Sequence, residues 1–72
     1  MRKIVGDNLT WIRIEKGLTQ EQVAEGSGFS QQYLSSLERG QYNPTIITIY
    51  ELSLALETTY FSLILPEDTR GR

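Results

Sequence analysis

The chain has 72 residues and contains neither cysteine nor histidine, which excludes disulfides, thiolate chemistry, the common zinc sites and the usual general base. Its length allows one domain with a small core, and 39% hydrophobic and 22% charged residues are typical of a globular protein. The net charge of -2 and the pI of about 4.9 argue against nucleic-acid binding, because a DNA-binding module is usually basic.

The first residues show no targeting pattern. No long apolar run follows Arg2 and Lys3, so we expect neither a signal peptide nor a membrane helix, and a soluble protein of the cytoplasm. No nucleophile is paired with a base in the pattern of the sequence, so an enzyme is the weakest functional hypothesis. No metal and no cofactor are expected.

Apolar residues near the N-terminus follow a helical spacing. Three of them fall at i, i+4 and i+7, namely Val5, Leu9 and Ile12. This spacing predicts a helix over residues 4–16, which ends at Gly17. Trp11 and Ile14 lie off that stripe, so the helix has either a wide buried face or a second contact surface.

Two short helices follow. A capping box that begins at Thr19 opens the first of them, and the glycine-rich residues 26–28 close it and turn the chain. Ser30 caps the next helix, in which Leu34 and Leu37 lie three residues apart on one side.

The remaining residues predict two more helices. Residues 41–44 end in proline and form an irregular loop, because proline forces the residue before it out of helical geometry. Thr45 caps a fourth helix that runs to about residue 56. Its residues spaced for burial are Ile46, Ile49, Leu52, Ala55 and Leu56. A last helix covers residues 60–65, and residues 67–72 form a flexible tail. The predicted fold is all-α, a compact five-helix bundle over residues 1–66.

Four residues of the second and third helices meet the steric needs of a helix-turn-helix. Ala24 lets the two helices cross closely, Gly28 makes the tight turn, and Leu34 and Leu37 anchor the third helix to the body. Each residue alone is weak evidence. Together, in register and with both N-caps in place, they indicate a helix-turn-helix over about residues 20–38.

At these residues the sequence resembles the small helix-turn-helix transcriptional regulators typified by the lambdoid phage repressor and Cro proteins. The matching stretches are GLTQEQVA at 17–24, GFS at 28–30, YLSSLERG at 33–40 and NPT at 43–45. The resemblance spans roughly residues 5–56. It implies a DNA-binding regulator, a repressor or controller, that binds a palindromic operator in double-stranded DNA as a homodimer. The third helix, about residues 30–38, would lie in the major groove.

Base contacts are expected from the start of the third helix. Gln31 and Gln32 match positions that meet base edges, and a glutamine amide can pair with adenine, which is worth ~1 to 3 kcal/mol of discrimination. Tyr33 and Ser36 extend the same face toward a thymine methyl, a base edge or a phosphate. The alternative is that both glutamines are solvated first-turn residues.

Phosphate contacts are expected at the helix ends. Gln20 matches a phosphate-contacting position of the family. Further candidates are Ser35, Arg39, Gln41, Tyr42, Asn43 and Thr45. Residues 30–37 carry no charge, so the acidic residues lie elsewhere and need not repel DNA. With few basic contacts, we expect weak non-specific binding and a shallow salt dependence.

Two further features concern the third helix, called the reading helix below because it would contact the bases. One concerns how this helix is held against the rest of the domain, and the other how two copies of the chain would pair. The resemblance implies that Arg13 and Glu38 form an ion pair that braces the first helix against the third. The apolar run at residues 60–65 exceeds what a monomer comfortably exposes. It predicts a two-fold dimer interface, made of packed helices or exchanged strands, with Tyr60, Leu63, Ile64 and Leu65.

Several kinds of protein fit this pattern. Phage or mobile-element regulators, restriction-modification controllers and antitoxins are not separated by the sequence. A second hypothesis is a protein-protein interaction module of the same fold, which the low pI and the apolar C-terminal run favour. A regulatory protein is therefore a further candidate partner. A DNA-binding regulator would be associated with the nucleoid when bound.

Overall fold

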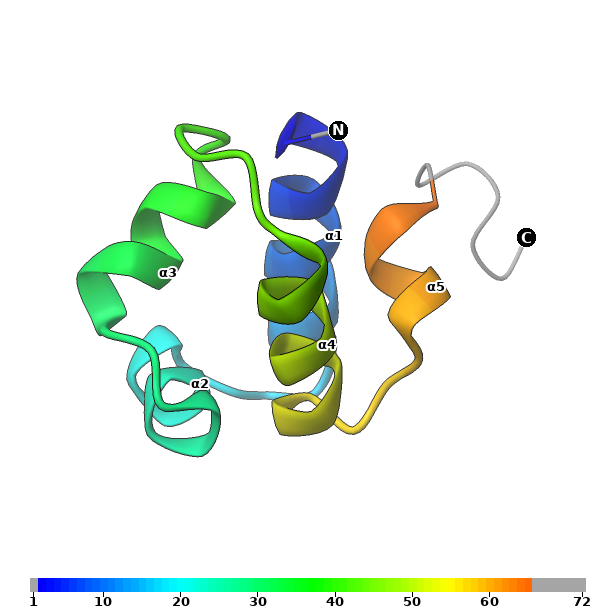
Figure 1. Ribbon diagram of the computed structural model, residues 1–72. Coiled ribbons are helices and arrows are strands. Elements are labelled where there is room, and N and C mark those ends of the chain that lie inside the picture. The colour runs from blue at the N-terminus through cyan, green and yellow to red at the C-terminus, as the bar shows by residue number, and fades with distance from the viewer. Residues whose placement is uncertain (1, 66–72) are drawn as a thin grey trace.

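The computed structural model describes residues 2–65, and these residues form five α-helices and no strand (Figure 1). The helices are α1 (Arg2–Glu15), α2 (Gln20–Ser27), α3 (Gln31–Glu38), α4 (Ile46–Ala55) and α5 (Tyr60–Ile64). The predicted all-helical fold is confirmed, and the predicted bounds agree to within about two residues, as is usual for helix ends. The predicted tail lies outside the described residues. None of the described helices is long and apolar enough to cross a membrane.

Hydroxyl side chains begin four of these helices. In α2 to α5 the residue before the helix accepts a hydrogen bond from the backbone N–H three residues on, and these caps are Thr19, Ser30, Thr45 and Thr59. At Thr19 the side chain of Gln22 also accepts from the Thr19 N–H at 2.8 Å, which completes the capping box. Each cap satisfies a backbone donor that would otherwise have no partner, and is worth ~1 kcal/mol.

The core lies between α1 and the helices around it. In Figure 1, α1 stands between α3 and α5 with α4 in front, and α1 contacts both α3 and α5. The ten buried apolar side chains, each no more than 3% exposed, are Val5, Leu9, Ile12, Val23, Leu34, Leu37, Ile49, Leu52, Leu56 and Leu63. Full burial of such a side chain contributes ~1.5 to 3 kcal/mol.

The crossing of α1 and α3 is too close for a side chain at Gly6. A Cβ atom at this position would collide with the carbonyl oxygen of Leu37 and lie 3.0 Å from that of Glu38. Gly6 therefore lets the backbone of α1 pack directly on the C-terminal end of α3. No local pattern in the sequence marks this residue, because its role depends on a neighbour more than thirty positions away.

Asn8 fastens α5 to α1. Its buried side-chain amide donates hydrogen bonds to the carbonyl oxygens of Leu63 at 2.9 Å and Leu65 at 2.5 Å, two of the acceptors that the end of α5 leaves without a helical partner. Leu63 is completely buried inside its own chain. The prediction that it lies at a dimer interface is therefore wrong. Residues 60–64 are helical, so the alternative of exchanged strands does not apply to them.

Candidate nucleic-acid interface

The third helix is buried on one side and exposed on the other. Leu34 and Leu37 are each 1% exposed and join the core. Gln31 and Gln32, in the first turn, are exposed, and neither side chain hydrogen-bonds within the part of the chain that the structure describes. Both glutamine amides are therefore free to pair with a ligand.

The turn before α3 fixes its direction. Gly28 ends α2 with φ of 84°, in the left-handed region that favours glycine, and its N–H donates to the Ala24 carbonyl at 2.9 Å. Ser27 accepts from the Phe29 N–H at 3.3 Å, and Ser30 then caps α3. The predicted role of Gly28 in the turn agrees with this geometry, and Ala24 is half-buried against the core.

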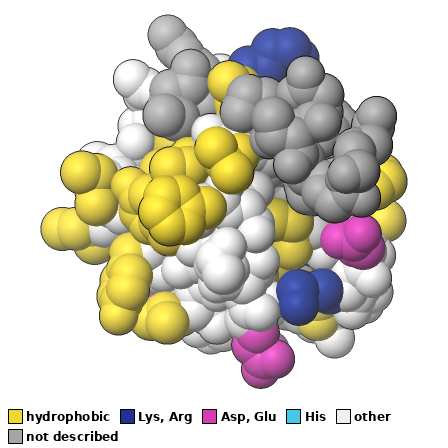
Figure 2. Space-filling model, turned by 90° about the vertical axis from the view of Figure 1, so that its right-hand side faces the viewer, with side chains coloured by type: hydrophobic (Ala, Val, Ile, Leu, Met, Phe, Trp, Pro, Cys, Tyr) yellow, Lys and Arg dark blue, Asp and Glu magenta, His cyan; other side chains and the backbone are white. Residues whose placement is uncertain are grey.

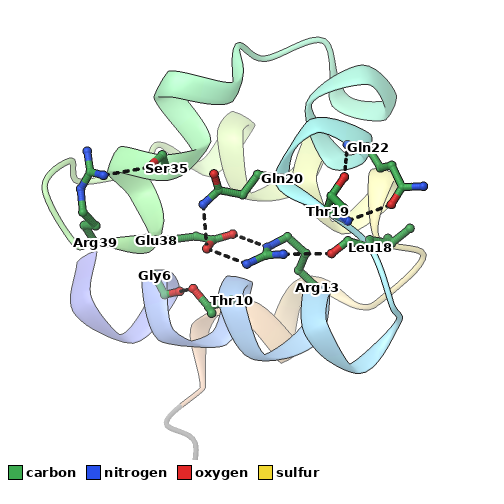
Figure 3. A network of polar contacts seen from close by, with 10 residues as sticks. All are labelled: Gly6, Thr10, Arg13, Leu18, Thr19, Gln20, Gln22, Ser35, Glu38 and Arg39. Carbon is green, nitrogen blue, oxygen red and sulfur yellow. Dashed lines mark hydrogen bonds and ion pairs between the residues drawn. The ribbon is translucent and has the colours of Figure 1, made fainter.

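A network of three side chains ties α3 to α1 and α2 (Figure 3). Arg13 and Glu38 form the ion pair that the resemblance implied, with Nε 2.7 Å from Oε2 and Nη2 3.2 Å from Oε1. Arg13 Nη1 also donates to the Leu18 carbonyl at 2.9 Å. The two side chains are only 16% and 8% exposed, so the pair is shielded from water and its geometry is bidentate.

Gln20 completes this network. Its amide Nε2 donates to Glu38 Oε1 at 3.1 Å, across the space between α2 and α3 (Figure 3). The predicted phosphate contact of Gln20 stays a prediction, and one amide hydrogen remains for it because an NH₂ group carries two donors. Gln20 thus links the start of α2 to the reading helix.

Arg39 is held at the C-terminal end of α3. Its Nη1 donates to Ser35 Oγ at 2.9 Å, as Figure 3 shows, and its Nη2 donates to Gln41 Oε1 at 3.4 Å. The structure therefore brings together three residues that were predicted to contact phosphates. Ser35 and Gln41 orient the guanidinium, which carries the positive charge.

Tyr33 packs between two other aromatic side chains. Its ring centre lies 5.4 Å from that of Phe29 and 5.8 Å from that of Tyr42, and its hydroxyl lies 3.4 Å from Thr48 Oγ1. A shallow hollow opens beside it, lined by Ser30, Gln32, Tyr33, Ser36 and Tyr42. The half-buried Tyr33 thus contributes to packing as well as to the exposed face, while Asn43 is exposed in the adjoining loop.

A second surface stands out on α4 and α5. We call it the α4–α5 apolar face, and it consists of Ile46, Ile47, Tyr50, Leu54, Phe61 and Leu65, which are between 46% and 72% exposed. Figure 2 looks onto the side of the molecule where α5 lies, and apolar side chains gather over the left half of this view. The sequence-based prediction that Ile46 is buried is wrong. Of the predicted dimer residues, Leu65 belongs to this face, while Tyr60 and Ile64 are half-buried against the core.

The fold and the site together define the class of protein. A capped helix, a left-handed glycine turn and a braced helix with an uncharged polar face are the parts of a helix-turn-helix unit. A family model described as Helix-turn-helix matches residues 9–63, which is most of the chain. The chain belongs to this family.

Similar proteins agree with the assignment. The chain is 62% identical over 68 residues to an uncharacterised HTH-type transcriptional regulator, y4dJ, of Sinorhizobium fredii, covering 94% of this chain and 88% of that protein. The crystal structure of a hypothetical transcription factor, NHTF, from Neisseria matches with a TM-score of 0.90 at 30% identity, over 96% of this chain and 79% of that one. The restriction-modification controller protein C.Esp1396I, solved as a tetramer with its natural 35 base-pair operator, matches with a TM-score of 0.79 at 33% identity, over 83% of each chain.

Proposed function

We propose that this chain is a sequence-specific regulator of transcription that binds a palindromic operator as a homodimer, with α3 in the major groove. The observation that carries the proposal is the pair of exposed, unbonded glutamines on a helix whose opposite face is locked into the core. A reading helix needs this combination, because base recognition requires free polar groups on a support that does not move. Relatives named as transcriptional regulators, and a controller solved on its operator, support it.

The exposed side of α3 contacts the bases in this proposal. Gln31 and Gln32 offer the donor and acceptor pair that fits adenine N6 and N7. Ser36 and Tyr33 border the hollow beside them and reach the next base pair or the adjoining backbone. Leu34 and Leu37 have no reading role, because both are buried.

Phosphate binding is divided between one charged side chain and the helix ends. Arg39 is oriented by Ser35 and Gln41 and supplies the ionic contact. The starts of α2 and α4 offer backbone N–H groups and the positive end of the helix dipole. Gln20 and Thr45 stand at these two starts, and Tyr42 and Asn43 flank the second one.

The α4–α5 apolar face is the proposed dimer interface. A helix that is apolar on every side is normally buried, and α4 presents Ile46, Ile47, Tyr50 and Leu54 outward while Leu52 faces the core. Its only charged residue is Glu51, and α5 carries none, so two copies can meet here without bringing many like charges together. Two-fold pairing would place the two reading helices one turn of DNA apart, about 34 Å.

The proposal also fixes how and where the protein acts. It acts by binding DNA, as expected for a member of a helix-turn-helix family whose relatives are named transcriptional regulators. It acts where its operator DNA lies, which places it in the cytoplasm and, when bound, on the nucleoid.

Two matched sets of glutamine variants test this function. An operator would first be selected from random DNA with the wild-type protein, and binding to it and to unrelated DNA would then be measured. Gln31→Ala combined with Gln32→Ala should lower the affinity of the dimer for its operator by roughly 25-fold or more for each half-site, and leave binding to unrelated DNA unchanged, because each base contact is worth ~1 to 3 kcal/mol. Gln41→Ala should weaken binding to both DNAs by the same modest factor. Full operator binding by the double variant would refute the proposal.

A further inference from the structure

A buried threonine connects the two parts of the proposed DNA surface. Thr48 lies one turn into α4 and is only 7% exposed, so it cannot touch DNA. Its Oγ1 lies 3.0 Å from Thr45 Oγ1, at the start of α4, and 3.4 Å from the hydroxyl oxygen of Tyr33, on α3. Three hydroxyl groups therefore form a continuous chain between a predicted phosphate contact and a predicted base contact.

The number of protons in this chain limits what its ends can do. Each hydroxyl has one hydrogen to donate. The two links inside the chain use two of the three hydrogens, so one remains to be donated outward. If Thr45 donates outward, Thr48 donates to Thr45 and Tyr33 donates to Thr48. In the other two arrangements Thr45 donates to Thr48, and the spare hydrogen then belongs either to Tyr33 or to Thr48 itself.

A phosphate at Thr45 selects the first of these three arrangements. Its oxygens only accept hydrogen bonds, so a phosphate bound at Thr45 takes the outward hydrogen at that end. Tyr33 must then donate inward, and its hydroxyl shows only lone pairs to the groove. In this state Tyr33 prefers a base edge that donates, which in the major groove means the amino group of adenine N6 or cytosine N4.

From this geometry we infer that Thr48 is a positioning residue, which couples phosphate binding at Thr45 to the hydrogen-bonding character of Tyr33 and so sets which base Tyr33 accepts. The inference rests on the proposed function and names a determinant of its specificity. The bond between the Thr48 N–H and Thr45 Oγ1, at 3.1 Å, holds Thr45 in place independently of the Thr48 side chain. The hydroxyl of Thr48 can thus be removed without removing the cap of α4.

The test measures discrimination at single base pairs of the selected operator. In Tyr33→Phe, discrimination between operators that differ at one base pair should fall at the base pair that Tyr33 reads, and this identifies that base pair. Thr48→Val keeps the shape of the side chain and removes its hydroxyl, and it should reduce discrimination at the same base pair by about 3- to 10-fold, the effect of one hydrogen bond. Thr48→Ser retains the hydroxyl and should keep the wild-type pattern. In the double variant the two losses should not multiply, because they break one chain.

Several outcomes would overturn the inference. Unchanged discrimination in Thr48→Val, an equal loss in Thr48→Ser, multiplying losses in the double variant, or no affected base pair in Tyr33→Phe would each do so. A ratio of affinities for two DNAs in one preparation does not depend on the folded fraction. If Thr48→Val fails to fold, Thr48→Ala makes the same test. If the wild-type protein selects no sequence at all, the proposed function fails instead.

Discussion

Removal of the carboxylate that braces α3 should destabilise the protein far more than loss of an exposed ion pair. In Glu38→Ala, the guanidinium of Arg13 loses both of its bonds to the carboxylate, at 2.7 and 3.2 Å, and Gln20 loses its acceptor. Breaking a shielded pair by removing one partner costs ~3 to 5 kcal/mol. Since Arg13 is still 16% exposed, we expect a value near the lower limit. A domain of this length has a free energy of unfolding of about 4 to 11 kcal/mol, so the loss is a large part of the total.

Urea denaturation followed by far-ultraviolet circular dichroism measures this effect. Asp7→Asn is the matched control, because it breaks the pair between Lys3 and Asp7, which is 3.6 Å long and whose side chains are 86% and 52% exposed. That pair is worth at most ~0.5 kcal/mol. Arg13→Met combined with Glu38→Leu should recover much of the loss, since no charge is then left without a partner. A cost for Glu38→Ala as small as that for Asp7→Asn would refute the reasoning.

Three further predictions concern the reading helix, the dimer and salt. Gly6→Ala should push α3 away from α1 and lower operator affinity at least 10-fold in filter binding, and wild-type affinity in a folded variant would contradict the close crossing. Leu54→Glu should raise the dimer dissociation constant in sedimentation at least ~30-fold, because Leu54 is 56% exposed and its burial counts ~1 kcal/mol or more in each copy. An unchanged dissociation constant would show that α4 is not part of the dimer interface. The plot of log affinity against log salt should be shallow, with Arg39 as the main ionic contact, so that Arg39→Gln, which removes one contact from each subunit of the dimer, lowers the steepness of the slope by ~2. A steep slope together with tight binding to random DNA would contradict this distribution of charge.

The helices and the turn were predictable because their causes are local. The caps at Thr19 and Ser30 act on backbone groups three residues away, and Gly28 acts within its own turn. Such signals lie within a single window of the sequence. Helix ends and the order of elements therefore follow from short-range chemistry.

The outward face of α4 was not predictable in this way. Helical spacing marks which residues share a side, but on α4 apolar residues occur on every side, so Ile46 was placed in the core when it is 72% exposed. Leu63 is the opposite case, because it was predicted to lie at a dimer interface and is instead buried in the core. Which side of an apolar helix is covered depends on where the other helices pack. A signal was present nonetheless, because a helix without a polar side implies a partner.

The candidate site also has a part that the sequence predicts and a part that it does not. The exposure of Gln31 and Gln32 follows from the positions of Leu34 and Leu37 on the opposite side of one helix. The bonds from Gln20 to Glu38 and from Tyr33 to Thr48 join residues of different helices. Sequence spacing carries no information on such contacts, and only the packed structure reveals them.

Selection of bound sequences from a random double-stranded DNA pool tests the central claim most directly, because it examines the reading helix and the dimer together. We expect enrichment of one sequence with two inverted half-sites whose centres lie about 34 Å apart, one turn of DNA. Loss of that enrichment in the variant with both Gln31→Ala and Gln32→Ala would assign the reading to α3. A wild-type protein that enriches no sequence, or only a single site without symmetry, would contradict the account.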